Sequence, residues 1–470
     1  MQDVTLAKRL LAIGIFVAAC FLAVASSLLL VRSVEVGVAL YTIASVVVLL
    51  TIEPFIGLIY FVLFFYLSPQ VLVPALSAVP LTLITGVAAC GSMWIRAALG
   101  GSQFRVFNVP QNYLVAWFTL AIVISPLARL DFQESISATY DWMVNVVLFV
   151  LITGLVTTGK RLRIILHVIV LATLWLAIQG IVQYFTGIGF AGDLDADERI
   201  EAIGMYGDPN NLALHLLLVV PLLYSEFTRG SSGLSRAYAL TSLLILIGAI
   251  YLTNSRGGVL SFAAVMAILF VRRHGLVAGI FFAAAAFTMI LAFGPSRVRE
   301  VSATEPSAYG RILMWNESFR LFFSHPVFGV GAGRFAEASA LKKAAHNSFL
   351  NCASELGVFG LLPWVLLIYI SIKNAFYVSR QAIVSNFKHL GIHAEGIAFG
   401  LLAFVFAAIF LSTTYAFGLM MFVGLSVAAT NIFVDNGQER YQLFEKGDLF
   451  RGLLLAAGGL IIFKLFLMMV

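Results

Sequence analysis

The chain has 470 residues, of which 61% are hydrophobic and only 11% are charged, and its formal net charge is +6. Soluble domains usually carry about 25% charged residues, so this composition excludes an ordinary soluble protein and predicts a polytopic membrane protein. The sequence has no basic tail and no basic patch interleaved with aromatic residues, which argues against a nucleic-acid partner. The first apolar segment lacks a small-residue cleavage pattern, so we expect it to remain in the protein as a helix.

Apolar segments follow one another along most of the chain. A helix needs roughly 20 residues to cross the hydrocarbon core of a bilayer. On that basis we predict an all-α polytopic protein with about 12–15 transmembrane helices, the lower count applying if some short early segments are re-entrant or paired. The segments are residues 10–31, 36–52, 54–68, 77–95, 112–129, 141–158, 164–186, 209–226, 237–253, 258–271, 275–293, 347–372, 394–412, 414–433 and 451–469.

The distribution of lysine and arginine predicts the orientation of these segments. When the segments alternate in direction, most basic residues of the short loops fall on one side, which the positive-inside rule makes cytoplasmic. These sites are Lys8 with Arg9, Arg96 with Arg105, Lys160 to Arg163, Arg229 with Arg236, Arg272 with Arg273, and Lys373 to Lys388. The opposite, external side then holds the loop 187–208, the short turn 254–257 and the long loop 294–346.

The long loop 294–346 is long enough to form a small cap on the external face. Its segment 311–323 has apolar residues at roughly helical spacing, which predicts a short amphipathic helix on the bilayer surface. Three glycines follow, and Gly333 with Arg334 could present a backbone and a guanidinium group to an anion.

Arginine residues on the external side are candidates for binding phosphate. Arg199 is the single arginine of an acidic loop, Arg256 lies in the turn TNSRGG, and Arg311 opens the predicted amphipathic helix. Arginine stays charged at any relevant pH and binds phosphate oxygens through a planar fork. The alternative is that such arginines only reach lipid headgroups, and this alternative applies most to Arg320 and Arg334 taken singly.

His346 is the candidate general base, because the ordinary pKa of histidine lies near neutral pH. The residues alone leave a second explanation open, in which His346 only caps the following helix or bonds a loop carbonyl. Asn347 follows it directly. Asn210 opens another apolar segment, where helix capping is the local explanation, and Tyr206 and Trp315 suit the membrane interface.

Several chemistries lack their sequence signature. There is no GxxxxGK[ST] loop for nucleotide hydrolysis and no cluster with metal-ligand spacing. The three cysteines, Cys20, Cys90 and Cys352, lie in or beside apolar segments and are interpreted as packing residues. We therefore expect a mechanism that uses neither a metal ion nor another cofactor.

Four separated motifs resemble the O-antigen ligase and polymerase family of bacterial inner-membrane proteins. They are GMYGDPNNLA, TNSRGG, the run GRILMW to HPVFGVGAGRF, and AHNSFLNCASELGVFG, and together they cover roughly residues 195–365. The resemblance divides the chain into N-terminal transmembrane helices at 1–186, a ligase-like core at 187–372 with the periplasmic loops 187–208 and 294–346, and C-terminal transmembrane helices at 373–470.

The resemblance implies a glycosyltransferase of the inner membrane with a periplasmic active site. Such an enzyme takes a glycan from undecaprenyl pyrophosphate and passes it to an acceptor hydroxyl, with inversion expected for direct displacement. His346, Arg256 and Arg199 are then the expected catalytic residues. The expected substrate-binding residues are Arg311, Arg334, Asn210, Asn347, Tyr206 and Trp315.

The acceptor stays open at the level of sequence. Transfer to lipid A core would make the protein an O-antigen ligase of lipopolysaccharide biosynthesis, which is the preferred reading. Transfer to another carrier-linked glycan would make it an O-antigen or exopolysaccharide polymerase, and transfer to protein is a third possibility. A transporter of lipid-linked solutes would need charged residues along a mid-membrane path, whereas the closest candidates, Glu395 and Lys464, lie near segment ends.

Overall fold

The computed structural model of the chain describes residues 53–72, 76, 80–98, 109–194, 198–230, 232–293, 306–385, 387–436 and 444–469. The predicted segments 10–31 and 36–52 lie outside the described residues. In the described part the protein is almost entirely α-helical, with one short hairpin in which β1 (Ile188–Gly189) pairs with β2 (Gly192–Asp193). The prediction of an all-α membrane protein is therefore confirmed.

Every predicted segment from 54–68 onward coincides with a helix. These helices are α3 (Pro54–Leu67), α5 (Leu81–Ala98), α6 (Pro110–Leu127), α7 (Phe132–Leu155), α8 (Gly159–Thr186), α9 (Pro209–Arg229), α10 (Gly233–Leu252), α11 (Arg256–His274), α12 (Leu276–Phe293), α16 (Ser348–Val384), α17 (Lys388–Ala408), α18 (Phe417–Asp435) and α19 (Lys446–Met469). The shorter helices are α4 (Pro69–Leu72), η2 (Gly204–Tyr206), α14 (Pro306–Ser324) and α15 (Phe335–Ala338). Within the described residues, ten helices are long and apolar enough to cross a membrane, and α3 and part of α12 are apolar but shorter.

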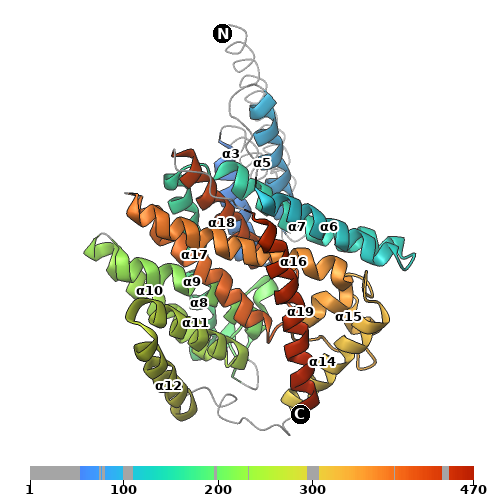
Figure 1. Ribbon diagram of the computed structural model, residues 1–470. Coiled ribbons are helices and arrows are strands. Elements are labelled where there is room, and N and C mark those ends of the chain that lie inside the picture. Colours follow the sequence, from blue (N-terminus) through green and yellow to red (C-terminus); the bar gives the residue numbers. More distant parts are fainter. Residues whose placement is uncertain are drawn as a thin grey trace, which may run out of the picture.

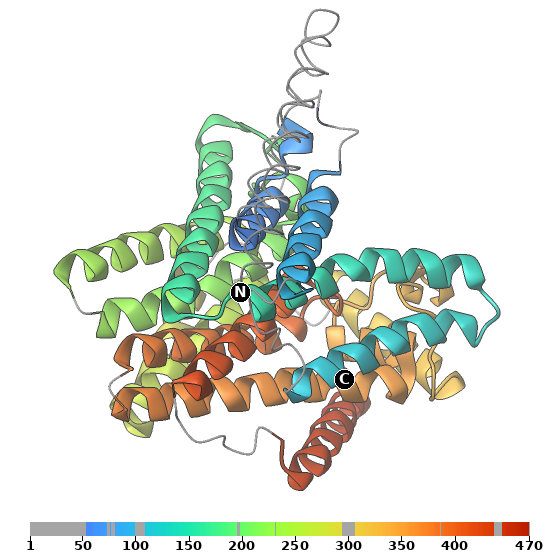
Figure 2. The same ribbon diagram turned by 90° about the horizontal axis from the view of Figure 1, so that it is seen from above.

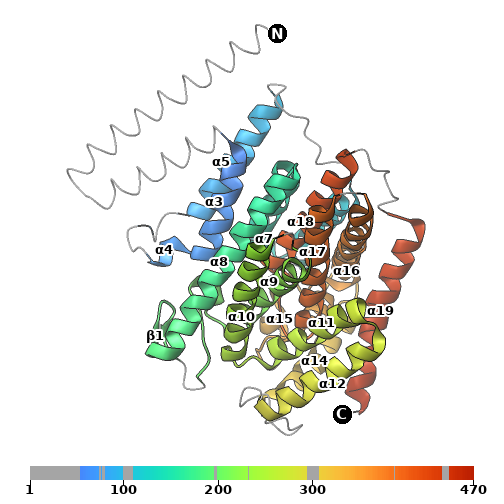
Figure 3. The ribbon, with the colours of Figure 1, turned by 90° about the vertical axis from the view of Figure 1, so that its left-hand side faces the viewer.

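The helices form a bundle whose centre is made by α9, α16, α17 and α18 (Figure 1). Nearly all of α18 is buried by its neighbours, whereas α19 lies along the outside of α16 with most of its apolar side chains exposed. Exposed apolar side chains on a spanning helix suit contact with lipid. Figure 3 shows β1 and α14 at the same end of the bundle, and we call this end the loop face.

The opposite end is held by ion pairs between helix ends. Glu395 of α17 pairs with Arg229 of α9 at 3.0 Å and with Arg272 of α11 at 3.5 Å. Two further carboxylates act similarly: Glu53 pairs with Arg161 and Arg96, and Asp448 pairs with Lys373 and Arg451. The basic residues of the predicted cytoplasmic loops thus gather at one end of the bundle. Their ion pairs connect helices that are not consecutive in the sequence.

The predicted amphipathic segment 311–323 lies within α14, and its apolar residues have a different partner from the one we expected. Instead of resting only on a bilayer surface, α14 packs against α16 and α19. Trp315 is the clearest example, since its ring lies 5.4 Å from that of Phe463 in α19 and the residue is 9% exposed. The apolar stripe of α14 therefore attaches this helix to the bundle.

Helix α16 is interrupted at Gly357, where φ is +62°. Residues 325–335, which we call the glycine loop, lie against this break. The amide of Val330 donates to the carbonyl of Ser354 at 2.9 Å, and the amide of Val358 donates to the carbonyl of Pro326 at 2.9 Å. The loop thus supplies the backbone partners that the interrupted helix lacks, which is needed wherever irregular backbone lies at the membrane.

The carboxylate of Glu355, two residues before the break, fixes the other end of the glycine loop. It accepts hydrogen bonds from the amides of Gly333 and Phe335, each at 3.0 Å, and from the hydroxyl of Tyr415 at 2.8 Å. Glu355 is 3% exposed, and a buried carboxylate is tolerated when several donors satisfy it. Glu355 therefore links the glycine loop, α16 and the segment that follows α17.

Candidate functional site

Arg199 lies on the loop face in the segment that connects β2 to α9. Its Nη2 donates to Oδ1 of Asn210 at 3.1 Å and its Nε donates to the carbonyl of Thr253 at 3.2 Å. The neighbouring residue Ile200 is fully buried, and its amide donates to the carbonyl of Leu252 at 3.3 Å. This segment is therefore anchored to the end of α10, and the anchoring directs the Arg199 guanidinium toward the start of α9.

Asn210 joins Arg199 to the start of α11. Its Oδ1 accepts a second hydrogen bond from the hydroxyl of Ser255, at 2.8 Å. Ser255 is the N-cap of α11, because its Oγ also accepts from the amide of Gly258 at 3.2 Å. Arg256 is the next residue and the first of α11. Three residues predicted from separate motifs, Arg199, Asn210 and Arg256, are thus brought to one place.

His346 lies immediately before α16, with a left-handed backbone (φ +51°) and an exposed side chain. Its amide donates to the hydroxyl of Ser412 at 2.8 Å. The next two residues are fixed as well: Asn347 caps α16 by accepting from the amides of Phe349 and Leu350, and Ser348 bonds to Leu411 and Thr413. The turn between α17 and α18 therefore holds the backbone of His346 while its ring is left at the surface.

Charges from two further elements act on the His346 ring. Partial enclosure by protein lowers the pKa of His346 below its ordinary value of 6.5, and the Arg311 guanidinium of α14 lowers it further. The carboxylate of Asp208, the N-cap of α9, acts in the opposite direction. Arg311 and Asp208 therefore lie near His346, and the imidazole is held in its neutral, proton-accepting form.

We call Arg199, Asn210, Arg256, Arg311 and His346 the arginine–histidine cluster. The N-termini of α9, α11 and α16 adjoin the cluster, and their N-cap residues are Asp208, Ser255 and Asn347. A helix N-terminus carries a partial positive charge and exposed amide donors. The arrangement is suited chemically to an anion with several oxygen atoms next to a neutral base.

Four predicted binding residues lie outside this cluster. Asn347 is buried and caps α16, as described above. Arg334 forms ion pairs with Asp131 at 2.9 Å and Glu134 at 3.4 Å, at the start of α7, and with Glu337 at 3.5 Å. Trp315 packs on α19, as described above. Tyr206 is fully buried, with its ring 4.8 Å from that of His215 and 5.8 Å from that of Tyr66. Their contacts are with the protein itself.

Sequence reasoning did not assign a role to Asp208, Ser255, Glu355 or Ser412, which shape the cluster and its support. Ser255 and Asp208 precede helices and could have been found as N-caps. The only sign of Ser412 is the polar run Ser412–Thr414 between two apolar segments. Among the described residues, no group of three or more histidine, cysteine, aspartate or glutamate side chains is placed to hold a metal ion.

Part of the chain is similar to a known protein family. Residues 241–365 match the family model described as O-antigen ligase, which confirms the resemblance found in the motifs. This range includes Arg256, Arg311 and His346, whereas Arg199 and Asn210 precede it. The chain is also 30% identical over 194 residues to the "Probable peptidoglycan glycosyltransferase FtsW" of Burkholderia thailandensis, a match that covers 38% of this chain and 41% of that protein.

Proposed function

On the premise that residues 241–365 match the O-antigen ligase family, we propose that this multi-pass membrane protein transfers a glycan from a lipid-linked pyrophosphate to an acceptor hydroxyl. The observation that carries the proposal is the arginine–histidine cluster. Arg311 and Asp208, the N-cap of α9, lie near the His346 imidazole, and Arg199 and the start of α11 meet at Asn210 in the first turn of α9. The similarity to a protein named as a glycosyltransferase supports the same reaction class.

The donor we propose is a glycan on undecaprenyl pyrophosphate. Arg199 and Arg256 bind the pyrophosphate together with the helix N-termini of α9 and α11, and Arg311 adds a third positive charge. These groups neutralise the negative charge that grows on the leaving pyrophosphate in the transition state. In this proposal guanidinium groups take the place that a metal ion has in many other transferases.

The acceptor hydroxyl is activated by His346. The imidazole accepts the hydroxyl proton as the oxygen attacks the anomeric carbon, and the bond from that carbon to the pyrophosphate breaks. Direct displacement inverts the anomeric configuration, and the proton on His346 is afterwards lost to solvent. The products are the glycosylated acceptor and undecaprenyl pyrophosphate.

We place this site at the periplasmic face of the inner membrane, within a core formed by residues 187–372. The support is the gathering of short-loop basic residues at the opposite end of the bundle, because such residues favour the cytoplasmic side. The acceptor we propose is lipid A core, which makes the protein an O-antigen ligase. An O-antigen or exopolysaccharide polymerase uses the same donor, and the experiment below separates the two.

The decisive test offers purified protein a glycan on undecaprenyl pyrophosphate, either with lipid A core or with more donor only. We expect transfer to the core in a single step, detected as a shift of the core on a gel and by mass spectrometry. Ladder-like growth of carrier-linked glycan without core would instead assign a polymerase. Lack of transfer to either acceptor by folded protein would contradict the proposal.

The pH dependence of transfer tests the role of His346 as a base. Because its pKa is lowered, the acid limb of kcat/KM is expected below pH 6.5. Arg311→Gln removes a charge that lowers this pKa, so the acid limb of the residual activity should move to higher pH. Asp208→Asn removes a charge that raises the pKa, so the limb should move to lower pH, while asparagine still caps α9. Shifts in the same direction in both variants would exclude His346 as the titrating group.

A further inference from the structure

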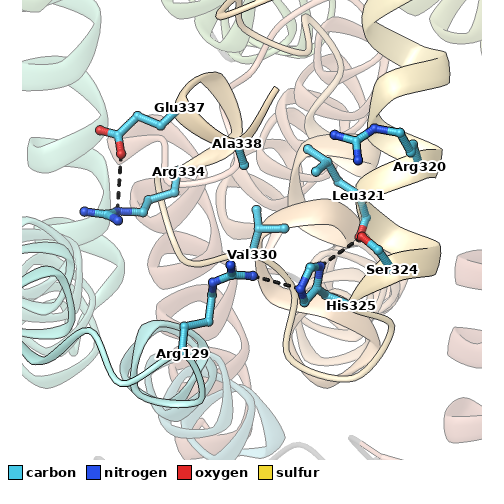
Figure 4. A pocket seen from close by; sticks show the side chains of 9 residues that line it. All are labelled: Arg129, Arg320, Leu321, Ser324, His325, Val330, Arg334, Glu337 and Ala338. Atoms are coloured by element: carbon cyan, nitrogen blue, oxygen red, sulfur yellow. Dashed lines mark hydrogen bonds and ion pairs between the residues drawn. The ribbon is translucent and has the colours of Figure 1, made fainter. Parts of the chain in front are cut away.

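A second polar site lies on the loop face, apart from the arginine–histidine cluster. It is a cavity of about 450 Å³ between the end of α14, the glycine loop and the turn that joins α6 to α7 (Figure 4). Figures 1 and 2 both show the α6–α7 hairpin reaching toward α14 and α15. The polar residues that line the cavity are Arg129, Arg320, Ser324, His325, Arg334 and Glu337.

Three guanidinium groups from three elements face this cavity, and they differ in how their charge is balanced. Arg320 is paired with Glu317 through two contacts of 2.7 and 2.8 Å. Arg334 is surrounded by three carboxylates. Arg129, within the part of the chain that the structure describes, contacts no carboxylate, and its side-chain partner is Nε2 of His325 at 2.9 Å. No carboxylate of the described residues therefore neutralises the positive charge of Arg129.

The hydrogen bonds of His325 define how it meets Arg129. Arginine can only donate, so Nε2 of His325 accepts and its proton lies on Nδ1. Nδ1 is 2.9 Å from Oγ of Ser324, which itself donates to the carbonyl of Leu321 at 2.8 Å. His325 is thus a neutral ring that orients Arg129 toward the cavity without offsetting its charge.

The position of the cavity separates it from the cluster. Arg311 belongs to the cluster and Ser324 to the cavity. The two residues are 13 positions apart in α14, which corresponds to about 20 Å along the helix at 1.5 Å per residue. An anion in this cavity therefore does not contact His346. Its ligand is an additional molecule, distinct from the pyrophosphate of the proposed reaction.

Large apolar side chains are exposed directly beside the charged residues. Leu130 follows Arg129 and is 79% exposed, and Phe323 precedes Ser324 and is 65% exposed. Phe132, three positions after Arg129, and Val327, two positions after His325, are exposed as well. A cavity that contains the unbalanced cation of Arg129 and has an apolar margin is complementary to an amphiphile whose negative headgroup sits beside hydrocarbon chains.

We propose that this cavity binds the phosphate group of an anionic membrane lipid. Arg129 donates charge-assisted hydrogen bonds to the phosphate oxygens. Arg320 and Arg334, whose charges are balanced by carboxylates, line the cavity as further N–H donors. The acyl chains lie against Leu130 and Phe323. The site would fix the α6–α7 turn to α14 and the glycine loop through a bound lipid, and it does not depend on the proposed transferase reaction.

The test measures lipid binding to the purified full chain in detergent by native mass spectrometry. The probes are short-chain phosphatidic acid, phosphatidylcholine of equal chain length, and inorganic phosphate. We expect phosphatidic acid to bind at least about ten-fold more tightly than either of the others. Arg129→Gln should weaken this binding about ten-fold, and Arg129→Lys, which keeps the charge without the planar fork, should weaken it less.

Lys343→Gln is the matched control, since it removes one exposed positive charge from the loop face outside the cavity. It should bind phosphatidic acid as the wild type does. Equal binding in wild type and Arg129→Gln would overturn the proposal, as would an equal loss in Lys343→Gln. Inorganic phosphate binding as tightly as phosphatidic acid would overturn the assignment to a lipid. Because Arg129 makes no ion pair in the described part of the chain, its variants are expected to fold, which a melting curve checks.

Discussion

Replacing His346 by alanine is expected to reduce glycan transfer by at least about 100-fold, because general-base catalysis typically contributes a factor of this size or more. The ring is exposed, and the bond from its backbone amide to Ser412 does not involve the side chain, so the variant should insert and fold normally. His346→Asn is a second variant that tolerates the left-handed backbone better than alanine. Turnover with the lipid-linked donor and acceptor is the measurement.

Arg256→Ala belongs to the same experiment, because the guanidinium is proposed to stabilise charge on the leaving pyrophosphate. Removing one such group typically costs about 100-fold or more in kcat. Lys343→Ala, which removes an exposed cation three residues before His346, is the control and should retain activity. Wild-type turnover in His346→Ala or in Arg256→Ala would remove that residue from the mechanism.

Among glycine-to-alanine substitutions in the interrupted region of α16, Gly357→Ala is expected to reduce the stability of the protein most. Its added Cβ would lie 2.2 Å from the carbonyl oxygen of Val327, a backbone atom that cannot rotate away, and φ is +62°. A left-handed conformation costs a non-glycine residue about 1–2 kcal/mol, and overpacking adds about 1–3 kcal/mol. The free energy of unfolding should therefore fall by about 3 kcal/mol or more, measured as a lower melting temperature in detergent.

Gly248→Ala is the matched control for this prediction. Gly248 also lies within a long helix, α10, but its added Cβ would have no atom within 4 Å and its φ is not left-handed. Alanine favours a helix over glycine by about 1 kcal/mol, so this variant should melt at the same or a slightly higher temperature. A similar loss in both variants would mean that the glycine loop does not depend on the close contact at Gly357.

The close contact between Gly357 and the glycine loop also connects the stability of the protein to the proposed chemistry. Displacing the glycine loop would disturb Glu355, which binds Tyr415 through its carboxylate. Tyr415 belongs to the segment that also contains Ser412, the partner of the His346 amide. We therefore expect the Gly357→Ala protein that remains folded to transfer glycan more slowly than wild type.

The sequence determined the local elements well, for a physical reason. Hydropathy and capping act over a few neighbouring residues, so the apolar segments from 54–68 onward and the helix start at Asn210 could be read directly. The motifs also indicated the family whose model matches residues 241–365, because Arg256, Arg311 and His346 lie within or beside short motifs typical of it. In α14 the spacing predicted the helix, although the partner of its apolar face could not be inferred from spacing.

Which arginines share a site was decided only by the tertiary structure. Arg311 and Arg334 look equivalent in sequence, since both lie in the long loop among aromatic and glycine residues. Arg334 meets Asp131 and Glu134, about 200 positions earlier in the chain, whereas Arg311 lies near His346. Long-range contacts of this kind depend on how helices pack, and no local pattern encodes them.

Which apolar helices are buried in the bundle was also decided only by the tertiary structure. Helices α18 and α19 are both predominantly apolar, yet α18 lies at the centre of the bundle and α19 at its outside. In a membrane, lipid and protein are both apolar surroundings, so hydropathy does not distinguish a helix packed by protein from one packed by lipid. Glu355 shows the polar counterpart, because only the folded chain brings the Gly333 and Phe335 amides and the Tyr415 hydroxyl to its carboxylate.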